Sequence, residues 1–91
     1  MYSITPYTYN QSKRIGVTVK PSLNKTKKID VIKRGKRIAS VGAYGMKDYP
    51  TYIKQNGPDY AKTRRRLYKM RHEKDRKIKW SRGWLADKLL W

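Results

Sequence analysis

The sequence contains no cysteine and no phenylalanine, and its only histidine is His72. Without cysteine the chain forms neither disulfides nor thiolate metal sites. A lone histidine with scattered carboxylates is not enough for a zinc site or a catalytic triad within one chain. No stretch approaches the roughly 20 apolar residues that span a bilayer, and the opening MYSITPYTYN lacks the basic and apolar regions of a secretory signal. We therefore expect no transmembrane segment and a location inside a cell or a particle.

Acidic residues are also scarce, with 6 Asp plus Glu in the whole chain. Two-metal nuclease chemistry needs clustered carboxylates, and the one close pair, Glu73 and Asp75, points to different faces of a helix. No phosphate-binding loop, dinucleotide fingerprint, zinc knuckle or heptad seam is present. We expect no enzymatic activity, no catalytic residue, no metal, no cofactor and no small-molecule substrate.

Positive charge is what the sequence has in excess. Its 91 residues contain 24 Lys plus Arg and have a formal net charge of +18. A domain with so much charge of one sign repels itself, so it usually binds a polyanion such as nucleic acid, an anionic membrane face or an acidic protein. Nucleic acid is the first of these candidates.

The first part of the chain predicts an arm followed by a small sheet. Residues 1–12 are rich in Tyr and uncharged, which favours an extended arm that docks on a neighbouring subunit or is disordered. Alternating apolar residues predict strands over 14–20, 28–33 and 36–44, with a tight turn at Arg34-Gly35. We expect a three-stranded antiparallel meander, followed by a structured loop rich in Gly, Tyr and Pro.

The second part predicts two helices. Pro58 marks the start of a long helix over 59–79, with Tyr60, Leu67 and Ile78 as its core stripe. This helix should pack on the meander, because so small a sheet is not stable alone. Ser81 predicts the N-cap of a short C-terminal helix that closes the core or docks on another chain. The fold class is α+β, with residues 13–91 as one small basic domain.

The candidate contacts for nucleic acid form two groups. The long helix has a basic face made of Lys62, Arg65, Arg66, Lys69, Arg76 and Lys77, interrupted only by Glu73. The tip of the predicted hairpin supplies Lys33, Arg34, Lys36 and Arg37. Each group also fits an ordinary solvated surface. Trp80 and Trp84 lie among Lys and Arg, a composition typical of base stacking, although we expect Trp84 in the core.

The succession KKIDVI, GKRIASVGAYGMKDY, RRRLYKMRHEKDR and SRGWLADKLLW resembles a family of small basic proteins of unknown function from large DNA viruses and some bacteriophages. The resemblance covers about Lys13 to Trp91 and departs at Val41, where the family has an aromatic residue. The matching positions are Gly42, Gly45, Asp48, Tyr49, Arg65, Tyr68, Arg71, His72, Gly83, Leu85, Leu90 and Trp91. The resemblance implies a viral protein, and because the function of the family is unknown it implies no particular biochemical activity.

From charge and resemblance together we expect a non-enzymatic virion structural protein that binds nucleic-acid phosphates without sequence specificity, because no base-reading motif is visible. It would lie in the virion interior, and in the host cytoplasm or nucleus before assembly. Its partners would be genome DNA or RNA, or an acidic inner capsid surface, with other virion proteins. Two alternatives remain open: a minor capsid or cement protein that holds subunits through its arm and Trp91, and an RNA-bound component of a ribonucleoprotein such as a ribosome.

Overall fold

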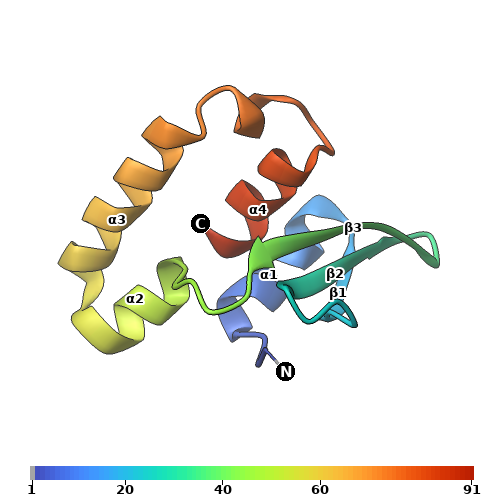
Figure 1. Ribbon diagram of the computed structural model, residues 1–91, viewed down its shortest axis with the longest axis horizontal. Coiled ribbons are helices and arrows are strands. Elements are labelled where there is room, and N and C mark those ends of the chain that lie inside the picture. The colour runs from blue at the N-terminus through green and yellow to red at the C-terminus, as the bar shows by residue number, and fades with distance from the viewer. Residues whose placement is uncertain (1) are drawn as a thin grey trace. The chain divides into compact units, whose positions relative to one another are not determined.

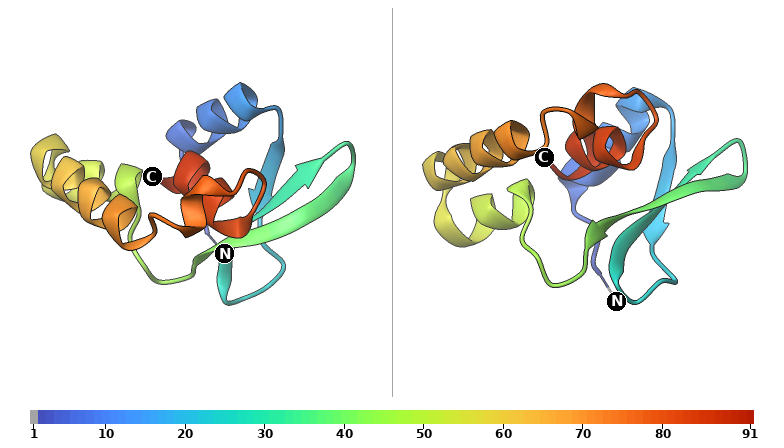
Figure 2. Two further views of the ribbon diagram at one scale, coloured as in Figure 1. Left: turned by 90° about the horizontal axis from the view of Figure 1, so that it is seen from above. Right: turned by 45° about the horizontal axis from the view of Figure 1, so that its top comes forward.

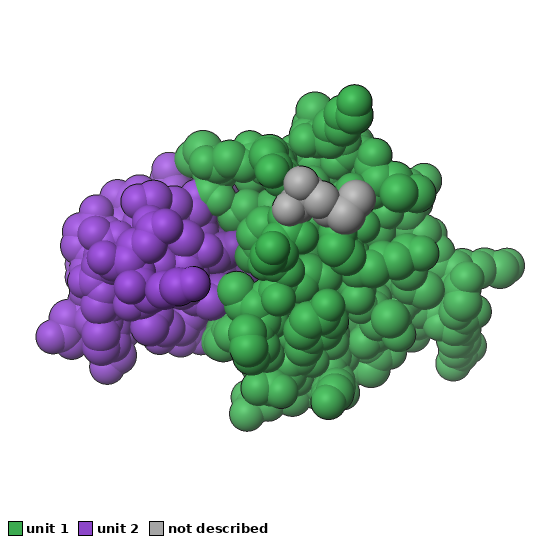
Figure 3. Space-filling view, turned by 90° about the horizontal axis from the view of Figure 1, so that it is seen from below, with its two compact units in different colours: residues 1–46 green, residues 47–91 purple. Residues whose placement is uncertain are grey.

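The structure is a computed structural model that describes residues 2–91 (Figure 1). It contains a three-stranded antiparallel sheet and four α-helices, which confirms the α+β class. The chain divides into two compact units, residues 1–46 and 47–91, which Figure 3 colours separately. Over the residues described, no helix is both long and apolar enough to cross a bilayer.

Unit 1 begins with a helix where an extended arm was expected. Helix α1 spans Pro6–Ile15, so residues 1–12 are not extended throughout, and Met1 lies outside the described residues. The Thr5 side chain caps the helix by accepting the N–H of Thr8, and Pro6 has a φ suited to the first turn. Gly16, at φ 78°, ends it. The expected strand over 14–20 is accordingly shorter, because its first residues complete α1.

The sheet follows as β1 (Thr18–Pro21), β2 (Lys27–Lys33) and β3 (Lys36–Ala43). The strands are ordered β1-β2-β3, so the predicted meander is confirmed. Strands β2 and β3 join through Arg34 and Gly35, both in the left-handed region, as a tight hairpin requires. The buried apolar residues of this unit are Val17, Val19, Ile29, Val31 and Val41.

Unit 2 begins with a helix in place of the expected loop. Helix α2 spans Tyr49–Asn56, and Asp48 caps it by accepting the N–H and O–H of Thr51. Helix α3 spans Pro58–Arg71 and starts where Pro58 predicts. The two helices pack against each other and lie side by side in both views of Figure 2. The expected packing of the long helix on the sheet stays a prediction.

The long helix expected over 59–79 ends early. After Arg71 the chain turns through a 3-10 helix, η1 (Asp75–Lys77), into α4 (Arg82–Leu90). Gly83 permits this return, because a Cβ there would lie 2.6 Å from the carbonyl oxygen and the Cβ of Asp75. The Ser81 hydroxyl accepts the N–H of Trp84, which confirms the predicted N-cap. The structure therefore has α3 and the single turn η1 where one continuous helix over 59–79 was expected.

The predicted core stripe of the long helix is wrong. Tyr60, Leu67 and Ile78 are exposed, and the buried residue of α3 is Ala61. Tyr68, which lies on the same side as Ala61, stacks on Trp91 with ring centroids 4.3 Å apart and 8° between the planes. The inward side of α3 therefore carries Ala61 and Tyr68, which lie on the flank of the predicted stripe and not within it.

Candidate nucleic-acid interface

Most of the predicted helix cations lie around one open hollow in unit 2. We call it the basic hollow, and its volume is about 400 Å³. Its lining residues are Lys62, Arg65, Arg66, Lys69, Met70, Glu73 and Arg76. Five of the six cations predicted on this face line it, although Arg76 comes from η1 and not from α3. The sixth, Lys77, does not line it and is bonded to Glu73.

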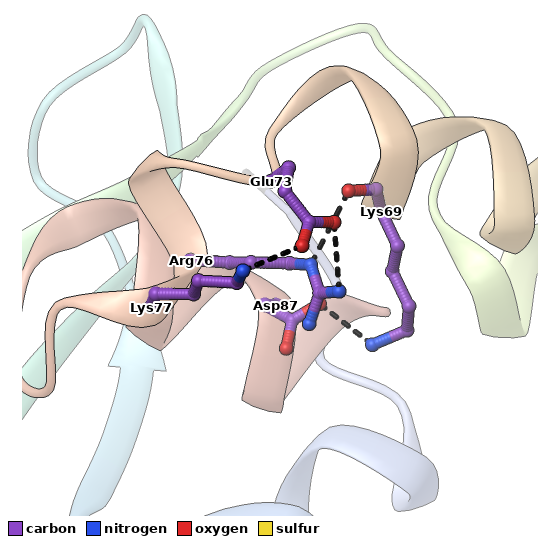
Figure 4. A network of polar contacts seen from close by, with 5 residues as sticks. All are labelled: Lys69, Glu73, Arg76, Lys77 and Asp87. Atoms are coloured by element: carbon purple, nitrogen blue, oxygen red, sulfur yellow. Dashed lines mark hydrogen bonds and ion pairs between the residues drawn. The ribbon is translucent and has the colours of Figure 1, made fainter.

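The single acid of the basic hollow is neutralised by two neighbours (Figure 4). Glu73 accepts the Lys77 ammonium at 2.7 Å and a guanidinium N–H of Arg76 at 3.3 Å. The hydrogen bond and charge of Lys77, followed by the charge of Arg76, hold the pKa of Glu73 below its usual value. Arg76 also donates its Nε–H to the carbonyl oxygen of Lys69 at 3.2 Å, which fixes η1 beside the end of α3. The hollow therefore keeps a clear excess of positive charge.

Two of the predicted cations, Lys69 and Arg65, make contacts within the protein. The Lys69 ammonium lies 2.6 Å from Oδ1 of Asp87, a carboxylate on α4 that is only 3% exposed. The Arg65 guanidinium lies over the ring of Tyr49, 4.8 Å from its centroid, and its Nε is buried without a hydrogen-bond partner among the described residues. Both side chains line the hollow, but each also makes a contact within the protein, Lys69 with Asp87 and Arg65 with Tyr49.

Lys62 and Arg66 are the available cations of the basic hollow. Both are exposed, and within residues 2–91 neither has an ion pair or a hydrogen bond from its side chain. An ammonium and a guanidinium on one helix, four residues apart, project from neighbouring turns of the same face. These two residues are the best placed to contact a bound anion.

The second predicted group lies at the β2–β3 hairpin tip in unit 1. Arg34, Lys36 and Arg37 are exposed there, and Lys33 is half-buried. The tip is visible in Figure 1 at the far end of these two strands from the β3–α2 connection. None of these four residues lines the basic hollow, and they belong to the other unit.

Arg34 occupies a strained position at this tip. Its φ is 53°, in the left-handed region, which costs an ordinary L-residue about 1–2 kcal/mol and costs Asn much less. We expect Arg34→Asn to raise the free energy of unfolding by about 1 kcal/mol. Urea unfolding measures this effect. Lys36→Asn removes the same charge without relieving the backbone, so equal stabilisation by both substitutions would contradict this account.

The only histidine of the sequence lies between an aromatic ring and a carboxylate in unit 2. His72 stacks on Tyr68, and its Nδ1 is 3.5 Å from the Asp75 carboxylate. Burial, with the carboxylates of Asp87 and Asp75, raises the pKa of Tyr68 to about 12, so the phenol stays neutral. Within residues 2–91 there is no group of three His, Cys, Asp or Glu side chains able to hold a metal ion.

Trp80 and Trp84 form a pair with ring centroids 4.9 Å apart and cations nearby. The ammonium groups of Lys79 and Lys88 lie 5.8 Å and 6.0 Å from their respective ring centroids. Both indoles are half-buried, so Trp84 is neither fully in the core nor on an open stacking surface.

Sequence reasoning did not predict that Asp30 and Asp87 are buried, and the same holds for Asp48, the N-cap of α2. Asp87 is the partner of Lys69, and Asp30 on β2 binds the loop before it. The only signal for either was an acid among mainly apolar residues, in IDVI for Asp30 and in WLADKLL for Asp87. Asp87 binds a basic side chain, whereas Asp30 accepts the hydroxyls of Ser22 and Ser40 and the N–H of Leu23.

A comparison of the chain with protein-family models finds no match, and comparisons with curated proteins and with solved structures also find none. The resemblance to small basic viral proteins therefore stays a prediction.

Proposed function

We propose that this protein is non-enzymatic and binds the phosphates of nucleic acid without sequence specificity, with the basic hollow as its main contact. The observation that carries the proposal is the hollow itself. Five cationic side chains surround it, and its one acid is held by Arg76 and Lys77. Asp87 offsets the charge of Lys69, but the other cations leave the hollow with a net positive charge that attracts an anion.

Phosphate is the anion that suits these groups. Arg66 offers a planar guanidinium fork and Lys62 a compact ammonium, and both types are common phosphate ligands. Phosphate contacts fix the position of a nucleic acid and carry no sequence information. The hairpin tip, with Arg34, Lys36 and Arg37, would add a second contact of the same kind.

The resemblance supports placing this activity inside a virus particle, against the genome. The alternative as a capsid or cement protein needs Trp91 and the N-terminal arm to grip other subunits. Trp91 is only 9% exposed and stacks on Tyr68, and α1 takes up part of the arm. These two observations favour binding to nucleic acid over a role as a capsid or cement protein.

Charge reversal of the two available cations tests the proposal. We expect Lys62→Glu/Arg66→Glu to lower the slope of log affinity against log salt by about 1.8 on duplex DNA, because two phosphate contacts are lost. The fold should remain, since both side chains are exposed and make no ion pair or side-chain hydrogen bond within residues 2–91. Fluorescence anisotropy over a range of salt concentrations gives the slope.

Lys20→Glu/Lys54→Glu is the matched control. It changes the net charge by the same amount at two exposed positions outside the basic hollow. The control should change the slope much less than the Lys62 and Arg66 variant. Equal losses in the two variants would mean that total charge, and not the hollow, determines binding.

A further inference from the structure

Unit 1 contains a second hollow, of about 410 Å³, at the end of the sheet opposite the hairpin tip. We call it the tyrosine pocket. Its lining residues are Tyr2, Ser22, Leu23, Asn24, Lys25, Lys27 and Tyr44. None of these residues was among the predicted contacts, and the proposed function does not use them.

The loop that forms the tyrosine pocket is held by Asp30. This carboxylate, only 1% exposed, accepts the hydroxyl of Ser22 at 2.6 Å and the N–H of Leu23 at 3.4 Å. The Ser22 oxygen in turn accepts the N–H of Asn24 at 3.0 Å. A loop fixed in this way on a central strand is a preformed surface, so a ligand loses little free energy in ordering it.

The apolar part of the pocket comes from two tyrosines and a leucine. Tyr44 is 51% exposed, and its backbone is fixed by an N–H to Thr26 carbonyl bond of 2.9 Å. Tyr2 is half-buried, and the Lys28 ammonium lies 5.3 Å from its ring centroid. Leu23 is largely exposed beside them. Aromatic rings at an open pocket can stack on another flat ring.

The polar part of the pocket consists of donors. The Asn24 Oδ1 accepts both the N–H and the hydroxyl of Thr26, at 2.9 Å and 2.8 Å. A backbone N–H can only donate, so the side-chain oxygen of Asn24 must face it, and the amide NH₂ is left without a partner among residues 2–91. The same is true of the ammonium groups of Lys25 and Lys27.

We propose that the tyrosine pocket binds an unpaired nucleobase of single-stranded nucleic acid. The base stacks against Tyr44 and Tyr2, the Asn24 NH₂ donates to an acceptor on the base or sugar, and Lys25 and Lys27 contact the adjoining phosphates. A duplex hides its base faces within its own stack, and an acidic peptide supplies charge but no flat ring for the apolar lining. The inference rests on the proposed function and adds the kind of nucleic acid that the protein prefers.

The test compares a short single strand of deoxythymidine with an abasic strand of the same number of phosphates and with a duplex. We expect the wild type to bind the thymidine strand more tightly than the abasic strand. Tyr44→Ala should weaken binding to the thymidine strand by at least about fivefold and leave the abasic strand within about twofold. Tyr9 on α1 is 45% exposed, close to the 51% of Tyr44, so Tyr9→Ala is the matched control and should leave all three affinities within about twofold.

The possible failures can be told apart. If the wild type binds none of the three ligands in a salt-dependent way, the proposed function fails and this inference fails with it. If it binds them but Tyr44→Ala loses nothing specifically on the thymidine strand, only this inference is overturned. Tighter binding to polyglutamate of matched charge would overturn it in favour of an acidic protein partner.

A direct mapping keeps the inference testable if Tyr44→Ala folds poorly. Photocrosslinking of the wild-type protein to a strand containing 5-iodouracil, followed by peptide sequencing, should label Tyr44 or Tyr2. Crosslinks found only in unit 2 would overturn the inference.

Discussion

Lys69→Met is expected to lower the free energy of unfolding by about 3–5 kcal/mol. The substitution keeps most of the apolar stem, so the main change is the loss of the ammonium 2.6 Å from Asp87. Asp87 is only 3% exposed, and within residues 2–91 Lys69 is the one group that pairs with it. The variant would leave a buried carboxylate without its partner, which costs more than the pair itself contributes.

Urea unfolding measures this loss, and two further variants define its cause. Lys62→Met removes a similar side chain from the same helix at an exposed position with no ion pair, so we expect a change within about 0.5 kcal/mol. Lys69→Met/Asp87→Leu removes both charges and should recover much of the lost stability. If Lys69→Met is no more destabilising than Lys62→Met, the Lys69–Asp87 ion pair does not stabilise the fold as proposed.

Asp30→Asn is expected to lower the free energy of unfolding by about 3 kcal/mol, because the amide replaces an ionised acceptor that binds several donors. Burial by itself would raise the pKa of Asp30. Hydrogen bonds from Ser22, Ser40 and the N–H of Leu23, together with the charge of Arg37, outweigh it and hold the pKa below its ordinary value of 3.8. The two hydroxyls each donate at 2.6 Å.

The lowered pKa of Asp30 also fixes the direction of a pH effect. A carboxyl group whose pKa is lower in the folded protein contributes stability that is complete above the unfolded pKa, near 3.8. That contribution is lost as the pH falls through the lower, folded pKa. Urea unfolding of the wild type should therefore show a loss of stability below about pH 4, and Asp30→Asn should lack that part of the loss.

Asp59→Asn is a suitable comparison for this pH effect, because Asp59 is exposed in the first turn of α3. We expect it to cost about 0.5 kcal/mol or less. If Asp30→Asn and the wild type lose stability in parallel as the pH falls, the ionised form of Asp30 does not hold the loop of the tyrosine pocket.

Elements that depend on local chemistry could be predicted from the sequence. Alternating apolar residues and the Arg34-Gly35 turn gave β2 and β3, and Ser81 gave the start of α4. The signals for α1 and α2 were also local. In each, a capping side chain, Thr5 or Asp48, is followed within two residues by proline. They were missed because both segments contain few aliphatic residues, which favoured reading them as an arm and a loop.

Features that depend on tertiary contacts could not be predicted in this way. The inward face of α3 is set by Tyr68 stacking on Trp91, a residue far along the chain, and not by the apolar stripe of the helix itself. The basic face was predicted because its cations follow helical spacing. The pairing of Lys69 with Asp87 was not predicted, since the burial of Asp87 depends on where α4 lies in unit 2.

The salt dependence of nucleic-acid binding tests the central claim most directly. Wild-type protein would be titrated at increasing salt with duplex DNA, with single-stranded RNA and with heparin as a polyanion of similar charge. The account predicts tighter binding to at least one nucleic acid than to heparin, with a log-log slope that corresponds to several phosphate contacts. Weak and equal binding to all three would contradict it, because the charge would then act only as general adhesion.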